Sequence, residues 1–140
     1  MKKEVIISFV GNQENDGEKD SVEFITEGKL YKKGGDYYVT YKESELTGME
    51  GTTTTIKVHG KKVTMLRFGT NNTQLIFEKG RHHVCCYDTV CGVISVGVWA
   101  NDVSVSLDEN GGEIFAAYNI DVDNSLVGNN DFKMQIRECQ

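Results

Sequence analysis

The sequence predicts an all-β protein built as a single-domain, up-and-down antiparallel β-barrel, and three observations support this fold class. Short segments rich in Val, Ile, Thr, Tyr and Phe recur along the chain, and apolar and polar residues alternate in many of them. That period of two is typical of strands with one buried face. The chain has 15 glycines and no proline, and most of the glycines fall between these segments, where tight turns are needed. No window of helical length has an apolar stripe with a period of 3.6 residues.

Each predicted strand is defined by residues two apart, which share one face. In the first strand the apolar stripe is formed by Val5, Ile7 and Phe9. Residues 11–20, GNQENDGEKD, have no apolar anchor and are predicted to form a flexible acidic loop. The complete set of predicted strands is 3–10, 20–31, 37–44, 52–59, 62–69, 73–79, 82–87, 91–99, 102–108, 112–122 and 131–138.

Tight turns are predicted between neighbouring strands, so consecutive strands are expected to pair as a meander. Gly and Asn tolerate positive φ, and they concentrate at 33–36, 59–61, 70–72, 110–112 and 128–130. So many strands within 140 residues are expected to close into one barrel over 1–140, because closure removes exposed edges. A two-sheet sandwich is the alternative architecture.

The charge of the chain argues against several classes of partner. The formal net charge is −6, and no run of Lys or Arg exceeds two residues, which disfavours nucleic acid and anionic membrane surfaces. No apolar run approaches the length of a membrane span, and the N-terminal MKKEVIISFVG lacks the features of a secretory signal. We therefore expect a soluble cytoplasmic protein whose four cysteines remain thiols.

Spaced residues along most of the chain resemble the bacterial YwiB-like family of lipocalin/calycin-like β-barrels. The resemblance covers about residues 4–138 and implies a closed or nearly closed antiparallel barrel. The family is described as having no established biochemical function, so the resemblance informs the fold and not the activity. Cys91 stands where an aromatic residue is expected before Gly92. The matching features are Phe24-x-Thr26-x-Gly28, Tyr41-x-Glu43, Thr54-x-Ile56-x-Val58, Val63-x-Met65-x-Arg67-x-Gly69, Phe77-x-x-Gly80, Tyr87 with Gly92, and Leu107 with Gly112-x-Ile114 and Tyr118.

Several polar residues occupy positions that alternation assigns to the barrel interior, and they form the candidate ligand-binding site. Because an unpaired buried charge costs several kcal/mol, Glu43 and Arg67 should meet each other, water or a ligand. One interpretation is a purely structural network. The other is the polar end of a cavity, where the planar fork of Arg67 meets an anionic group. The candidate residues are Tyr41, Glu43, Thr54, Arg67, Tyr87 and Tyr118.

A second polar cluster lies in HHVCCYDTVC, residues 82–91, whose His and Cys side chains are of the types that zinc prefers. Pleating places His82 and Cys86 on one face and His83 and Cys85 on the other, and no Cys-x-x-Cys pair occurs. A thiolate nucleophile would also lack a third orienting group. We therefore predict no metal site, no cofactor and no catalytic residue.

Three functional hypotheses remain at this stage. The favoured hypothesis is a cytoplasmic barrel that binds a small anionic or amphipathic ligand in its interior. The alternative is a non-catalytic structural or protein-interaction barrel whose interior is filled with side chains. A metal- or thiol-dependent enzyme centred on residues 82–91 is the least favoured. Ligand, protein partners and oligomeric state do not follow from the sequence.

Overall fold

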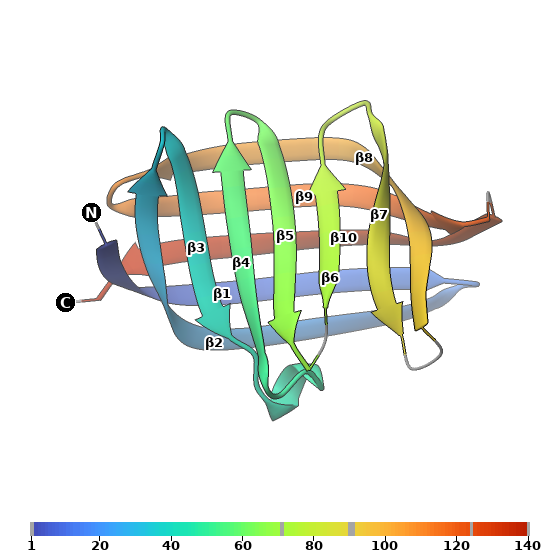
Figure 1. The fold of residues 1–140 in the computed structure, drawn as a ribbon, viewed down its shortest axis with the longest axis horizontal. Helices are drawn as coiled ribbons and strands as arrows, with labels where there is room; N and C mark the ends of the chain where they lie inside the picture. The colour runs from blue at the N-terminus through green and yellow to red at the C-terminus, as the bar shows by residue number, and fades with distance from the viewer. Residues whose placement is uncertain (1, 71, 90–91, 124, 140) are drawn as a thin grey trace.

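The alternating apolar stripes of consecutive segments come together in a closed antiparallel barrel, seen in the computed structural model of the chain (Figure 1). The structure describes residues 2–70, 72–89, 92–123 and 125–139. Each strand pairs with the next along the chain, and β1 pairs with β10 to close the barrel, which confirms the all-β, up-and-down prediction. The strands are β1 Lys2–Asn15, β2 Glu18–Lys33, β3 Asp36–Lys42, β4 Thr52–His59, β5 Lys62–Gly69, β6 Thr73–Phe77, β7 His82–Thr89, β8 Gly92–Asp108, β9 Gly111–Val122 and β10 Ser125–Glu138.

The prediction of a loop at 11–20 is wrong. β1 and β2 continue as a paired hairpin as far as Asn15 and Glu18, and the turn between them is Asp16–Gly17. Both turn residues have positive φ, 52° at Asp16 and 80° at Gly17, as a two-residue hairpin requires. A polar ribbon needs no apolar stripe when backbone ladder bonds hold it, which is why hydrophobic alternation missed it.

Two further boundaries differ from the prediction. The first of them reduces the number of strands from eleven to ten. The segments 91–99 and 102–108 belong to one strand, β8, which continues through a β-bulge between Ala100 and Asp102. The turn expected at 128–130 lies inside β10, which begins at Ser125. A bulge adds an unpaired residue without ending a strand, so the alternation in the sequence is interrupted there and predicts two strands in place of one. The aromatic-to-cysteine difference at position 91 falls outside the described residues.

Figure 1 shows two layers whose strands cross steeply. β3, β4, β5, β6 and β7 run across β1, β2, β8, β9 and β10, and the N- and C-termini lie near each other. Such crossed layers need strands that bend from one layer into the other. β2 bends before it meets β3, where a Cβ on Gly28 would stand 2.5 Å from the carbonyl oxygen of Thr40. Only glycine permits that approach, which also brings Tyr41 beside Gly28.

The apolar core fills much of the interior with side chains from all ten strands. The inward positions are largely those that alternation predicts, including Val39 and Tyr41 on β3, Ile56 on β4 and Met65 on β5. Ile94 departs from the prediction, because it is exposed near the start of β8. Within the described residues, no helix is long and apolar enough to span a membrane.

The ladder between β6 and β7 is the weakest part of the barrel wall. Among the described residues it consists of one pair, Thr73 with Tyr87, and a backbone bond from Asp88 N–H to the Asn72 carbonyl at 3.0 Å. The two strands therefore separate over most of their length. Tyr87, which belongs to the one paired position, has 36% of its surface exposed.

Candidate functional site

The candidate site starts where β3 ends and the chain turns toward β4. The hydroxyl of Ser44 accepts a hydrogen bond from the Leu46 N–H at 3.3 Å and caps the short 3₁₀ helix η1, Glu45–Thr47. Gly48, with φ of 71°, ends this helix. The turn folds Thr47 back over the side chain of Glu43, whose backbone N–H donates to the Thr52 carbonyl at 2.8 Å.

The Glu43 carboxylate is buried at the centre of a hydroxyl cluster. Its side chain is 1% exposed. Oε1 accepts a hydrogen bond from the Thr47 hydroxyl at 3.1 Å, and Oε2 accepts one from the Thr54 hydroxyl. The phenol of Tyr41 also hydrogen-bonds to this carboxylate. These hydroxyls satisfy much of the acceptor capacity of the carboxylate, so Glu43 is held in one position.

Arg67 faces this carboxylate without a hydrogen bond to it. Nε of Arg67 lies 3.9 Å from Oε2 of Glu43, within the range of an ion pair, and the arginine side chain is 15% exposed. Nε is buried and has no hydrogen-bond partner among the described residues. A buried donor without an acceptor is destabilising, and most such groups in native proteins are paired. The Nε of Arg67 is therefore a buried donor that faces a carboxylate without a hydrogen bond to it.

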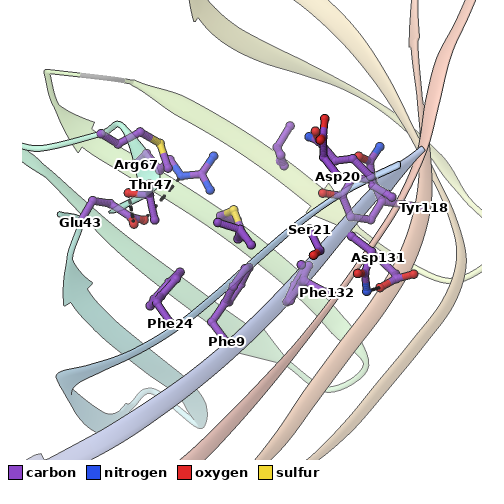
Figure 2. Close-up of a pocket in the computed structure, with 18 of the residues that line it drawn as sticks. Phe9, Asp20, Ser21, Phe24, Glu43, Thr47, Arg67, Tyr118, Asp131 and Phe132 are labelled. Atoms are coloured by element: carbon purple, nitrogen blue, oxygen red, sulfur yellow. Dashed lines mark hydrogen bonds and ion pairs between the residues drawn. The ribbon is translucent and has the colours of Figure 1, made fainter. Parts of the chain in front are cut away.

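The guanidinium points into a pocket of about 480 Å³ that is partly open to solvent. Figure 2 shows Phe24, Phe9 and Phe132 in a row along the pocket, with Glu43, Thr47 and Arg67 at one end. Phe9 stacks on Phe24 at 5.0 Å and on Phe132 at 5.7 Å between ring centroids. The three rings, which we call the aromatic wall, give the pocket an apolar side next to its polar end.

Two tyrosines of the site are held in their neutral form. Burial, followed by the charge of Glu43 and the hydrogen bond to it, raises the pKa of Tyr41 well above its usual value. Burial also raises the pKa of Tyr118 to about 12, although the charge of Arg67 opposes the shift. Both phenols therefore act as neutral hydrogen-bonding groups at physiological pH.

The structure brings five of the six predicted site residues to this pocket: Tyr41, Glu43, Arg67, Tyr87 and Tyr118 all line it. Thr54 is fully buried behind it and contributes through its bond to Glu43. The predicted approach of Glu43 to Arg67 is also present, as a long ion pair.

Other lining residues were not singled out from the sequence. Phe9 and Phe24 lie on predicted inward stripes, so alternation contained a signal for them that was interpreted only as core. Thr47 gave no signal, because it contacts Glu43 through the η1 turn and not through strand alternation.

The histidines of residues 82–91 hydrogen-bond to carboxylates on neighbouring segments. His82 Nε2 lies 3.0 Å from Asp121, and His83 Nε2 lies 3.0 Å from Glu78. Cys85 is buried, Cys86 is exposed, and both are free thiols. No group of three or more metal-ligating side chains occurs in the described part of the chain, which does not include Cys91.

Comparison with known proteins places this barrel in a family. The uncharacterized beta-barrel protein YwiB of Bacillus subtilis (strain 168) is 28% identical over 109 residues, which cover 78% of this chain and 75% of that protein. The crystal structure of ywiB protein from Bacillus subtilis superposes with a TM-score of 0.88 at 22% identity, covering 99% of this chain and 94% of that one. Residues 7–134 match the family described as Domain of unknown function (DUF1934), and the chain therefore belongs to that family.

Proposed function

We propose that this protein is a non-enzymatic carrier or sensor that binds a small molecule with one anionic group and an apolar body. The observation that carries the proposal is the guanidinium of Arg67, which points into a hollow pocket while its buried Nε has no hydrogen-bond partner among the described residues. Pockets of roughly 300–1,000 Å³ hold typical small ligands, and about 480 Å³ lies within that range.

The arrangement of charges limits what this pocket can accept. Glu43 already offsets the charge of Arg67, so the pair together is close to neutral. A monoanion can hydrogen-bond to the arginine fork, whereas a polyanion would meet the Glu43 carboxylate with excess negative charge. The aromatic wall of Phe9, Phe24 and Phe132 suits an apolar or aromatic body beside the anionic group.

The proposal includes a lipocalin/calycin-like mode of binding, with the ligand inside the barrel, and a cytoplasmic location. Cys85, Cys86 and Cys139 are free thiols, which fits a reducing compartment.

The fluorescent anion 8-anilinonaphthalene-1-sulfonate tests the proposal, because it combines one sulfonate with an aromatic body. We expect it to bind the wild type and to be displaced by 4-methoxybenzoate. Arg67→Lys keeps the charge but removes the planar fork, so affinity for both should fall about tenfold. Arg137→Lys, at an exposed arginine outside the pocket, is the matched control. Equal affinity of wild type and Arg67→Lys would refute the role of Arg67.

A protein-interaction role is the second candidate, and exposed apolar residues on the outer face of β7 and β8 favour it. Val84 is 71% exposed and Val93 is 67% exposed. Trp99 is also exposed on β8, with its ring centroid 6.2 Å from that of His82. Replacing Val84 and Val93 by lysine should abolish any association through this face and leave probe binding unchanged. Loss of probe binding instead would link this face to the pocket.

A further inference from the structure

A second hollow of about 530 Å³ adjoins the pocket, because the two share seven lining residues, among them Asn12, Tyr118 and Asn130. Figure 2 shows Tyr118, which lines both hollows, at a distance from Glu43 across the pocket. We call the second hollow the vestibule. It is defined by six carboxamide side chains: Asn12, Gln13, Asn101, Asn119, Asn129 and Asn130.

Carboxamides give the vestibule a specific chemistry. Each one offers two N–H donors and an acceptor oxygen, so it can both donate to and accept from a hydroxyl group. Asn12 donates to Asp131 at 2.8 Å, and Asn101 donates to Asn119 at 3.3 Å. Each of these bonds uses one donor of one amide, so each donating amide keeps a second N–H and its oxygen for other partners. A ligand group rich in hydroxyls could both donate hydrogen bonds to these amides and accept hydrogen bonds from them.

Irregularities of the barrel bring these amides together. The two register shifts among the described strand pairs lie between Ala100 and Asp102 on β8 and between Leu126 and Gly128 on β10. Asn101 is the residue inserted by the first shift, and Asn129 and Asn130 directly follow the second. Bulges bend a strand and change the direction of its side chains, and they occur often beside binding sites.

The charges of the vestibule determine which kind of ligand group fits there. Glu14, Asp20 and Asp131 line it together with one cation, Lys19. The excess of carboxylates repels a second anionic group and accepts hydrogen bonds from hydroxyls. Figure 2 places Asp20, Tyr118 and Asp131 at the opposite end of the aromatic wall from Arg67. The outer end of a bound molecule must therefore differ in charge from its inner end.

We propose that the vestibule binds a neutral, hydroxyl-rich group, so that the ligand is a glycoside or polyol conjugate of an apolar acid, with its acid at Arg67. This inference rests on the proposed function for the orientation of the ligand. It adds the chemical class of the outer group, and it excludes nucleotides and other polyanions.

Three probes separate the two ends of the ligand in titrations followed by ¹H–¹⁵N NMR. 4-Carboxyphenyl β-D-glucopyranoside carries acid, ring and sugar; 4-methoxybenzoate lacks the sugar; phenyl β-D-glucopyranoside lacks the acid. We expect the full glucoside to bind about tenfold more tightly than 4-methoxybenzoate, as one or two net hydrogen bonds would give. It should also shift the side-chain amide signals of Asn119 and Asn129, which line the vestibule and not the pocket.

Variants assign this gain to the vestibule. Asn119→Leu with Asn129→Leu, at two amides that line the vestibule and not the pocket, should remove the advantage of the glucoside and leave the affinity for 4-methoxybenzoate within about twofold. Asn110→Leu, at an amide in the β8–β9 turn outside the vestibule, is the matched control and should change neither affinity.

The outcomes separate the two proposals. If 4-methoxybenzoate binds through Arg67 but the glucoside gains nothing, the vestibule inference is wrong and the proposed function stands. If neither acid binds, the proposed function is wrong. Phenyl β-D-glucopyranoside then tests the vestibule inference by itself. Shifts of the side-chain amide signals of Asn119 and Asn129, which line only the vestibule, support hydroxyl recognition, and their absence overturns it.

Discussion

Removal of the Glu43 carboxylate is the most direct test of the interior network. Glu43→Ala would leave the hydroxyls of Thr47 and Thr54 without their acceptor and Arg67 without its counter-charge. Breaking a buried ion pair by deleting one partner costs about 3–5 kcal/mol. Because 15% of the Arg67 side chain is exposed beside an open pocket, water relieves part of this penalty. We therefore expect the lower end, about 3 kcal/mol of unfolding free energy.

That loss is large enough for two independent assays. For a chain of 140 residues, about 3 kcal/mol corresponds to a fall in Tm of roughly 10 °C, which scanning calorimetry would detect. Urea unfolding should show a lower midpoint with an unchanged slope. Glu113→Ala is the matched control, because Glu113 is exposed and its 3.7 Å pair with Lys133 contributes about 1 kcal/mol or less.

The double variant Glu43→Ala/Arg67→Ala distinguishes a coupled pair from two independent residues. If the ion pair is real, removing both charges should cost about 1–2 kcal/mol less than the sum of the single changes. Strict additivity would refute the coupling. A change below about 0.5 kcal/mol in Glu43→Ala would refute the buried network altogether.

Three further predictions concern other parts of the barrel. Burial raises the pKa of Tyr118 to about 12 from 10.0, so the contribution of this tyrosine to stability should be complete below pH 10 and decline as the pH rises toward 12. Over that range the urea midpoint of Tyr118→Phe should fall less than that of the wild type. Iodoacetamide should label exposed Cys86 before Cys85, whose pKa burial raises, and equal rates in peptide mass spectra would contradict the described packing. Gly28→Ala should lower the unfolding free energy by about 1–3 kcal/mol, because the new Cβ would crowd the β2 bend. Glu27→Ala, at the exposed neighbouring position, should change the unfolding free energy little. An unchanged urea midpoint for Gly28→Ala would show that the bend can relax.

The sequence predicted the strands correctly where apolar and polar residues alternate with a period of two. The prediction was wrong where that alternation is absent or interrupted. Apolar alternation located most of the strands and their inward faces. The hairpin ends of β1 and β2 have polar residues on both faces and were mistaken for a loop. The β8 bulge at Asn101 was mistaken for a break between two strands, because an inserted residue interrupts the alternation without ending the strand.

For the site, alternation was sufficient to place polar residues in the interior but not to describe their contacts. Tyr41, Glu43 and Arg67 were expected on inward faces, and the structure places them there. Thr47 was missed, because it reaches Glu43 through a short 3₁₀ helix that has no alternating pattern.

By itself, the sequence determined the class of fold and the side of the sheet on which each of these residues lies, because side-chain direction in a strand is a local property with a period of two. Only the tertiary structure decided that Glu43 is held by hydroxyls 3.9 Å from the Arg67 Nε, and that an amide-lined vestibule continues the pocket. Those features depend on register, bends and bulges, which set distances between side chains on different strands. Such distances are properties of the closed barrel and of no single segment.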